Sequence, residues 1–360
     1  MSIMNRATGA RHTEVNGARA RASALAGARA LRAAALIGLM SVGCTHAAGA
    51  VTLERPGQPL TVRRPALYPE TLEYDSRSDR FLVSSFREGA IYAVGSDGGV
   101  SLVVDDKRLC SVLGIAVDVE RGRLWAVNSD LGASVKPSAQ GPKNLAAVGI
   151  YDLATGAALD YVDLAPLSPG AHLVNGIALD SAGNGYVTDS FSPTIYKIDP
   201  QGNATVFLRD ERFAGEGINL NGVVVHPDGY LLIVKKSDGS LFKVPLASPS
   251  QLSQVDIPRR FVGGDGLVLV GKKDLVLIAN QTPAVASNAA FSLSSEDGWV
   301  SAELRSVQEL GDVYPTTGVL RGGKLYVISS KLNELIQSAP AQKDQLREQA
   351  TIRQIGTAAL

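Results

Sequence analysis

Short apolar stretches separated by polar turns recur along the chain from about residue 67. Each unit begins with a small or polar residue, continues with an alternating apolar segment, and then repeats turn and segment twice more. The third unit is the clearest, with apolar segments at 175–180, 185–189 and 194–199. Apolar and polar residues that alternate over four to eight positions are typical of β-strands. The pattern therefore predicts units of at least three strands each.

The same pattern predicts strands in five further units. These strands are 71–74, 80–85 and 90–94; 114–118, 123–127 and 148–152; 221–225, 230–234 and 240–244; 265–269, 274–279 and 298–301; 317–320, 324–328 and 333–336. A fourth strand per unit is predicted at 51–53 or 101–104, and at 204–208. Residues 342–348 are predicted as a short helix, and 351–355 are a candidate for one more strand.

The spacing of the units predicts the architecture. They begin at residues 70, 113, 175, 221, 265 and 317, so that consecutive starts are 43, 62, 46, 44 and 52 residues apart. A period in the forties with several strands per unit is the signature of a β-propeller. We therefore expect an all-β protein, a six-bladed β-propeller over residues 51–360. Long insertions at 128–145 and 281–296 are interpreted either as lids over a site or as surface excursions.

Four oxygen-bearing side chains stand at the same phase of the repeat: Glu70, Asn175, Asn221 and Asp265. In a closed ring, equal phase means equal height beside the central axis, so these oxygens would converge at one mouth. Carboxylate and amide oxygens are hard ligands that suit calcium far better than zinc or copper. The second and sixth units have Leu113 and Thr317 at this phase instead.

Each of these residues also has a simpler interpretation. Asn-Gly and Asp-Gly are common turn dipeptides, and a lone Glu70 would more often be an exposed charge. The coincidence of all four with the repeat is what favours a metal site. We expect calcium there, with magnesium, manganese or zinc as alternatives, and the ion could be catalytic or could only close the tunnel.

The charge balance differs between the N-terminal segment and the rest of the chain. The whole chain has no formal net charge, but residues 1–43 hold six Arg and one Glu, which leaves 29 basic and 34 acidic residues elsewhere. A mildly acidic domain gives no reason to expect nucleic-acid binding. With 45% hydrophobic residues and 37 glycines, the composition is that of a globular protein with many tight turns.

The N-terminal segment predicts export. An Arg-rich stretch leads into the apolar run 33–43, which is too short to span a bilayer and has the length of a signal-peptide core. We interpret residues 1–50 as a signal peptide, cleaved after Ala50, or ending as a lipoprotein signal before Cys44. The protein is then periplasmic or secreted, with a membrane link only through a lipid on Cys44. Cys110 alone cannot form a disulfide framework and is expected to be a small buried residue.

A Glu in the first unit, followed by Asn-Gly, Asn-Gly and Asp-Gly in the third, fourth and fifth units, resembles the senescence marker protein/regucalcin/gluconolactonase family. Diisopropyl fluorophosphatase and the paraoxonases are more distant cousins. The resemblance covers most of residues 65–340. It implies that Glu70, Asn175, Asn221 and Asp265 bind calcium or another divalent metal ion at the active-site mouth. It also implies hydrolysis of lactones, esters or organophosphates, with Asp265 activating water or attacking the substrate.

The chain departs from this family in two places. Leu173 stands where sugar lactonases of the family have an Arg, and Thr71 rather than Gly follows Glu70. An apolar Leu173 favours a less polar lactone or ester. His172 lies three residues before Asn175 and is a candidate general base, although a lone His in such a loop is more often not catalytic. His226 is expected to be structural.

Three functions are compatible with these observations. The first is an exported, metal-dependent lactonase or esterase that acts as a monomer on a small-molecule substrate. The second is a non-catalytic β-propeller that binds a ligand or another protein. The third is a metal-free propeller of the strictosidine-synthase type, in which a carboxylate performs acid–base chemistry. The complete set of oxygen ligands favours the first.

Overall fold

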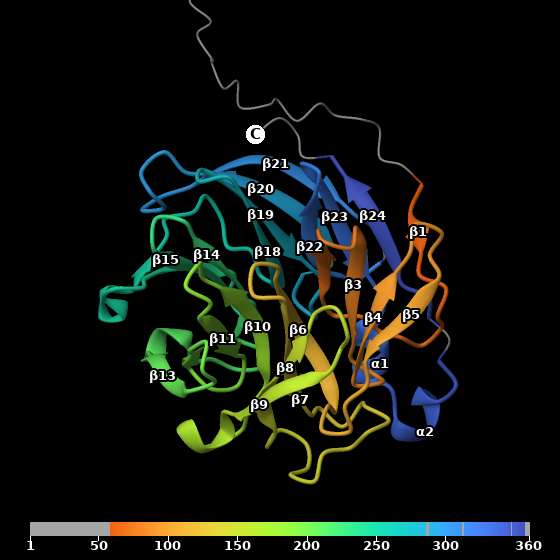
Figure 1. Cartoon of the computed structure of the whole chain (residues 1–360). Coiled ribbons are helices and arrows are strands. Elements are labelled where there is room, and N and C mark those ends of the chain that lie inside the picture. The colour runs from red at the N-terminus through yellow and green to blue at the C-terminus, as the bar shows by residue number, and fades with distance from the viewer. Residues whose placement is uncertain (1–57, 286–287, 312, 347, 357–360) are drawn as a thin grey trace, which may run out of the picture. The chain divides into compact units, whose positions relative to one another are not determined.

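The computed structural model describes residues 58–285, 288–311, 313–346 and 348–356. Six four-stranded antiparallel sheets are arranged as the blades of a propeller, and the first strands of the blades gather around its centre (Figure 1). The predicted six-bladed β-propeller is thereby confirmed. The predicted signal peptide over 1–50, Cys44 and the strand at 51–53 all lie outside the described residues.

The first five blades are continuous in sequence, and each runs from the centre outward. Their strands are β2 (Leu72–Asp75), β3 (Arg80–Ser85), β4 (Ala90–Val94) and β5 (Val100–Val104); β6 (Ser111–Asp118), β7 (Arg123–Ser129), β8 (Ala146–Asp152) and β9 (Ala158–Asp163); β10 (Val174–Leu179), β11 (Gly185–Asp189), β12 (Thr194–Ile198) and β13 (Ala204–Arg209); β14 (Leu220–His226), β15 (Tyr230–Lys235), β16 (Ser240–Pro245) and β17 (Ser253–Gln254); β18 (Gly264–Val270), β19 (Asp274–Ala279), β20 (Ala289–Ser294) and β21 (Glu303–Glu309).

The sixth blade joins the two ends of the described chain. Its inner strands are β22 (Pro315–Arg321) and β23 (Lys324–Ser329), followed by β24 (Thr351–Ile355) and, outermost, β1 (Leu60–Thr61). Because β1 precedes the first blade in sequence and pairs with β24 in the last, it closes the ring without leaving an open edge beside β24. The candidate strand at 351–355 is confirmed.

Burial explains why the inner strands are almost wholly apolar. The second strands, such as β3 and β15, are buried along nearly their whole length because neighbouring blades cover both faces. The outer strand β21 alternates between exposed and half-buried positions. A separate apolar cluster fills each gap between consecutive blades, and the one between the second and third contains Trp125 and Tyr196. The core is thus a ring of six inter-blade layers.

Two predicted strands are wrong. Residues 333–336 belong to a helix, α1 (Leu332–Gln337), because Leu332 and Leu335 are buried at helical spacing. Residues 298–301 form a turn, in which the Asp297 carboxylate accepts hydrogen bonds from the amides of Val300 and Ser301. The third strand of the fifth blade is β20 instead, so the second half of the predicted insertion at 281–296 contains a strand.

The remaining helical segments are short. A second helix, α2 (Pro340–Lys343), accounts for the start of the helix predicted at 342–348, which ends earlier than expected. Three single turns of 3₁₀-helix complete the list: Ala165–Leu167, Glu211–Phe213 and Pro249–Gln251. Within the described part of the chain, no helix is both long enough and apolar enough to cross a membrane.

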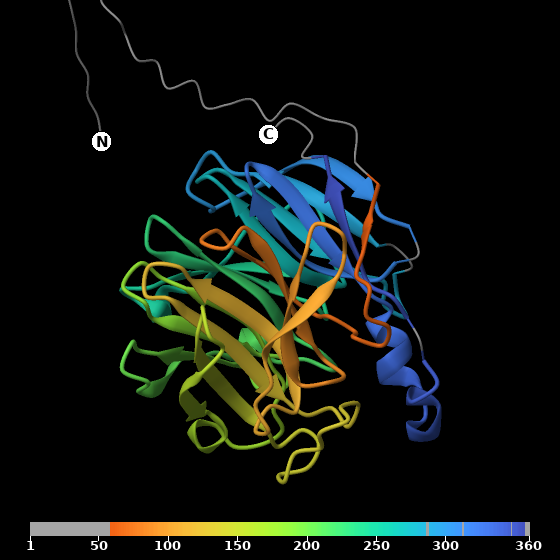
Figure 2. The same cartoon turned by 45° about the vertical axis from the view of Figure 1, so that its right-hand side comes forward.

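The insertion after β7 packs at the end of the ring where the first strands begin. Its Ala133 is buried in one apolar cluster, here called the mouth cluster, with members from three blades and from α1: Tyr68, Phe86, Leu113, Ala133, Leu173, Leu332 and Leu335. The Lys343 ammonium also donates to the carbonyl of Gly132, which ties α2 to this loop (Figure 2). Residues 130–145 and the C-terminal helices therefore cover the end of the ring that holds the predicted site.

Candidate metal-binding site

One position of the first strand is equivalent in all six blades. In the second to sixth blades, a bulge interrupts the pairing between the first two strands. Two residues of the first strand lie in this bulge, and the equivalent position is the first of the two. In the first blade, the bond from the Phe86 amide to the Tyr68 carbonyl places Glu70 at the same point. We call this the ring position, and its residues are Glu70, Leu113, Asn175, Asn221, Asp265 and Thr316.

In five blades, the residue at the ring position is the one predicted from the repeat. In the sixth blade it is a different residue. The position is held there by Thr316, not by Thr317 as the sequence pattern suggested. The register between Pro315 and Ser329 resumes at Gly318 with Val327, so the two bulge residues are Thr316 and Thr317, in that order. Apolar spacing could not resolve this, because two adjacent threonines fit the pattern equally well.

A glycine follows the ring position where neighbouring first strands approach most closely. A Cβ on Gly176 would lie 2.4 Å from the carbonyl oxygen of Asn221, and one on Gly222 would lie 2.2 Å from that of Asp265. These distances are far shorter than any allowed contact, so only glycine fits. The Asn-Gly and Asp-Gly pairs are therefore not turns here. They mark the contact of one blade's first strand with the next.

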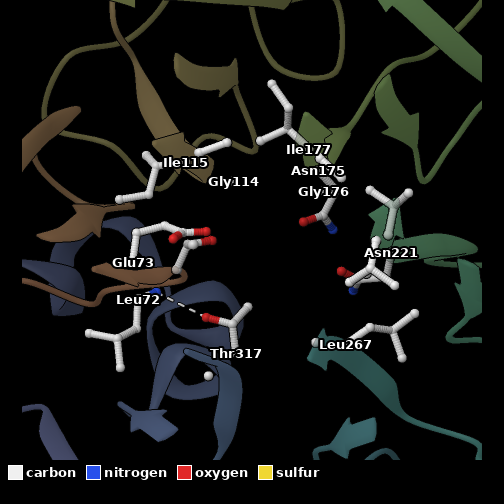
Figure 3. Close-up of a pocket in the computed structure, with 18 of the residues that line it drawn as sticks. Leu72, Glu73, Gly114, Ile115, Asn175, Gly176, Ile177, Asn221, Leu267 and Thr317 are labelled. Atoms are coloured by element: carbon white, nitrogen blue, oxygen red, sulfur yellow. Dashed lines mark hydrogen bonds between the residues drawn. The ribbon is translucent and has the colours of Figure 1, made fainter. Parts of the chain in front are cut away.

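The four predicted ligands come together at one cavity. Glu70, Asn175, Asn221 and Asp265 are each 4–5% exposed, and all four line a cavity of about 320 Å³ at the propeller axis. Figure 3 shows the side chains of Asn175 and Asn221 directed into the cavity from one side, and that of Glu73 from the other. Equal phase in the repeat thus does correspond to convergence in space.

Two oxygens of the four predicted ligands have no hydrogen-bond partner among the described residues. They are Oδ1 of Asn175 and Oδ1 of Asp265, and both are fully buried. Buried polar atoms are almost always paired, since leaving one unpaired costs about 1–3 kcal/mol. A third buried oxygen, Oγ1 of Thr316, is in the same situation. Unpaired acceptors at one height of the ring are what a bound cation would satisfy.

The other polar atoms of these side chains are held by neighbours. The Thr71 hydroxyl donates to Oε2 of Glu70 over 2.7 Å, and Nδ2 of Asn175 donates to Oγ of Ser190 over 3.1 Å. Oδ2 of Asp265 accepts from the Lys236 ammonium over 2.7 Å and from Nδ2 of Asn280. Each of these three side chains is thereby oriented before any ligand arrives.

Burial and like charge dominate the electrostatics of the site. Desolvation, and secondly the nearby Asp265 carboxylate, raise the pKa of Glu70 from 4.5 to about 8. Burial in the cavity wall also raises the pKa of Glu73 from 4.5 to about 7. For Lys236, burial alone would lower the pKa, but the Asp265 carboxylate outweighs it and raises the pKa instead. The site is therefore poorly solvated and short of positive charge.

The residues present fit a hard divalent cation. Two carboxylates and two amide oxygens supply only oxygen donors, as calcium prefers, and the unpaired Oδ1 atoms of Asn175 and Asp265 are of this kind. No cluster of three or more His, Cys, Asp or Glu side chains suited to a metal ion occurs in the described residues. A softer metal that needs imidazole or thiolate ligands would therefore find no such set there.

The comparisons with solved structures agree with the fold. The Mala s 1 allergen of Malassezia sympodialis is 18% identical, with a TM-score of 0.65 and coverage of 84% of this chain and 97% of its own. A luciferin-regenerating enzyme is 14% identical (TM-score 0.56, coverage 84% and 97%). XC5397 from Xanthomonas campestris, described as a gluconolactonase, is 12% identical (TM-score 0.55, coverage 82% and 89%). This likeness establishes the propeller fold.

Sequence comparison adds no closer relative. No protein-family model matches the chain, and no curated protein matches it. The structural neighbours nonetheless include gluconolactonase-like six-bladed propellers, so the resemblance drawn from the ring residues is confirmed at the level of fold. At 12–18% identity the neighbours' activities do not carry over to this chain.

His172 does not belong to the residues that line the cavity. It is 2% exposed, and its Nδ1 lies 2.8 Å from Oδ2 of Asp189, whose other oxygen accepts from the Leu173 amide. This hydrogen bond to Asp189 is also the main cause of the raised pKa of His172. The imidazole of His172 thus helps to hold the loop before β10. A catalytic role for His172 stays a prediction.

Three more residues considered in the sequence have clear surroundings in the structure. His226 is buried, bonds to the carbonyl of Lys272 and stacks on Tyr230, as a structural residue would. Leu173 is buried in the mouth cluster and does not line the cavity. Cys110 is a buried free thiol, as expected, and burial raises its pKa to about 12.

Sequence analysis missed three residues at the site: Lys236, Glu73 and Thr316. Glu73 fits the polar face of the alternating strand predicted at 71–74, and that face is part of the cavity wall. Lys236 follows β15 directly, at the position where four of the other blades have Ser or Asn. An alignment of the six repeats at that position is the signal that could have revealed it.

Proposed function

We propose that this protein is a metal-dependent hydrolase of a lactone or a related ester. The observation that supports the proposal is the ring of four oxygen-bearing side chains, from four blades, around one axial cavity. Two of their oxygens are buried and unpaired within the described residues. A structural role in the blades alone would not require buried, unpaired acceptors from different blades at one cavity.

In this proposal Glu70, Asn175, Asn221 and Asp265 hold a calcium ion, with magnesium, manganese or zinc as alternatives. When bound, such an ion polarises the substrate carbonyl and stabilises the negative charge that develops on its oxygen. The chain's own residues set the geometry. Lys236 and Asn280 hold Oδ2 of Asp265, so its Oδ1 is the atom available to accept a proton from water or to attack the substrate.

The cavity wall favours a substrate of low polarity. Beside the ring position it is formed by apolar side chains of the first strands, including Ile115, Ile177, Val223 and Leu267. Leu173, which stands where sugar lactonases of the family have an Arg, is buried in the mouth cluster and brings no charged group to the cavity. We therefore propose an aliphatic lactone or ester rather than a sugar lactone as the small-molecule substrate.

Thermal unfolding of the mature domain with and without calcium tests the metal site. After treatment with EDTA, added calcium should raise the Tm of the wild type because the ion binds only the folded state. The Asn221→Ala variant should lose this shift. Asn128→Ala is a matched control, since Asn128 is also buried but accepts from the Cys110 amide and does not line the cavity. It should be less stable yet keep the calcium shift.

A screen of lactones and esters then tests the reaction. We expect hydrolysis that EDTA abolishes and calcium restores. No Tm shift with any of the four metals, together with no hydrolysis, would instead favour a non-catalytic β-propeller that binds a ligand or protein. Export to the periplasm or the medium remains a proposal that depends on residues 1–50, as does a lipid anchor on Cys44.

A further inference from the structure

The residue that ends the second strand, or directly follows it, makes the same type of hydrogen bond in several blades. In four blades it is Ser129, Ser190, Asn280 or Ser330. Each donates a side-chain hydrogen bond to the next blade, to the carbonyl of the residue before the ring position. These bonds fasten consecutive first strands to one another beside the site. A short polar side chain is sufficient for this task.

Lys236 occupies the same position in the fourth blade. Its amide donates to the carbonyl of Asn219, just as the Ser190 amide donates to Leu173 and the Asn280 amide to Gly263. Its side chain does something different. The ammonium passes the backbone of the next blade and lies 2.7 Å from Oδ2 of Asp265, and it also bonds to Oδ1 of Asn280.

The surroundings of Lys236 use up its hydrogen-bonding capacity. A third contact, at 3.5 Å, reaches the carbonyl of Gly263, and the ring of Tyr314 lies 5.8 Å away. The side chain is only 8% exposed. An ammonium group has three donors and no acceptor, so this one is committed within the protein and is not free to hold a ligand.

Asn280 completes a clamp on Asp265. Its Nδ2 donates to the same Oδ2 that Lys236 binds, while its Oδ1 accepts from Lys236. Both donors therefore act on one oxygen of Asp265 and leave Oδ1 to the cavity. With Glu70 ionised, the ring position carries two negative charges, and Lys236 adds one positive charge beside them.

We propose that Lys236 is a positioning residue and a built-in counter-ion of the ring: it presents Asp265 through Oδ1 only and weakens the binding of divalent cations. The inference rests on the metal site of the proposed function. Opposite charge at hydrogen-bond distance stabilises Asp265 when no metal is bound, and the same charge repels an incoming cation across a poorly solvated cavity. The domain should therefore fold without calcium and bind it only moderately.

Isothermal titration of the EDTA-treated domain with calcium chloride tests this. Lys236→Gln removes the charge but keeps a donor for Asp265, and Asn280 still holds the carboxylate. We expect this variant to bind calcium at least about tenfold more tightly than the wild type and to gain a larger calcium-dependent Tm shift. Lys236→Met serves as a second neutral variant if the first does not fold. Lys236→Arg keeps the charge and should stay within about threefold of the wild type.

Lys235 provides a matched control. It is the adjacent lysine, its side chain is also 8% exposed, and its ammonium bonds to the carbonyls of Arg212 and Ala214 and not to Asp265. Lys235→Met should lower the Tm and leave the calcium affinity unchanged. A merely structural role for Lys236 would produce the same result in Lys236→Gln.

The outcomes separate this inference from the proposed function. Equal or weaker calcium binding by both neutral Lys236 variants, with binding intact in the wild type, would overturn the counter-ion role alone. Tight binding by the variants without measurable binding by the wild type would support that role and refute metal dependence of the native protein. Absence of binding in all variants would overturn both.

Discussion

Replacing Glu70 with Gln should make the metal-free protein more stable at neutral pH. Glu70 is buried, and its pKa of about 8 in the folded protein exceeds the ordinary 4.5 of an exposed Glu. A carboxylic acid with a raised pKa stabilises the folded state fully below its unfolded pKa. That contribution is lost as the pH rises from 4.5 through about 8. Gln has nearly the same shape, can still accept from Thr71 and cannot ionise.

The size of the effect follows from the difference in pKa. Each pKa unit corresponds to about 1.4 kcal/mol. At pH 7 Glu70 ionises freely only in the unfolded chain, so the raised pKa lowers the free energy of unfolding by about 3 kcal/mol relative to pH 4. Above pH 8 the cost approaches about 5 kcal/mol. Near pH 4 it vanishes, because Glu70 is then protonated in both states. Other titrating groups, including Glu73, act in both proteins and cancel in the comparison.

Urea unfolding in EDTA, from pH 4.5 to 8.5, measures this difference for wild type and Glu70→Gln. The free energies of unfolding should agree at the acidic end and diverge in favour of the variant as the pH rises. Calcium should then stabilise the wild type more than the variant. A difference that does not depend on pH, or a wild type more stable than the variant at pH 7, would refute the argument that Glu70 is buried without a sufficient partner.

Three further predictions concern the same site. Calcium affinity should rise by up to about tenfold per pH unit between pH 6 and 8, because binding must displace the Glu70 proton; a flat titration series would contradict this. Asp265→Ala should abolish both the calcium-dependent Tm shift and hydrolysis, and full activity would remove Asp265 from the site. His172→Ala should cost about 1–3 kcal/mol of stability, because buried Asp189 loses a partner; loss of one limb of the pH–rate profile would identify His172 as a general base, and an unchanged profile would leave it a structural residue.

The repeat allowed most of the fold to be predicted, and the errors have local physical causes. Strand period and turn residues identified the inner strands of all six blades, because those strands are buried on both faces and tolerate few polar residues. The sequence 298–301 reads as apolar and extended, but Asp297 binds its amides and bends it into a turn. In 332–337, Leu332 and Leu335 are spaced for one face of a helix, whereas a strand would place them on opposite faces.

The candidate site could be predicted where a residue type is unusual for its position in the repeat. Glu70 and Asp265 are carboxylates at the start of buried strands, and an ionisable group there calls for an explanation. Thr316 escaped because only the bulge, not the composition, distinguishes it from Thr317. Lys236 escaped because its position lies at the far end of a different strand, and a lysine after a strand is ordinarily solvated.

The sequence by itself determined that the chain forms six similar units, and that four of them bring an oxygen-bearing side chain to the same phase. Both properties are periodic, and a period can be read without knowing how the units pack. Only the tertiary structure decided which atoms remain unpaired and what surrounds them. The charge of Lys236 reaches Asp265 across a blade boundary, 29 residues away in sequence. Such a contact depends on how blades are placed side by side, which no local pattern records.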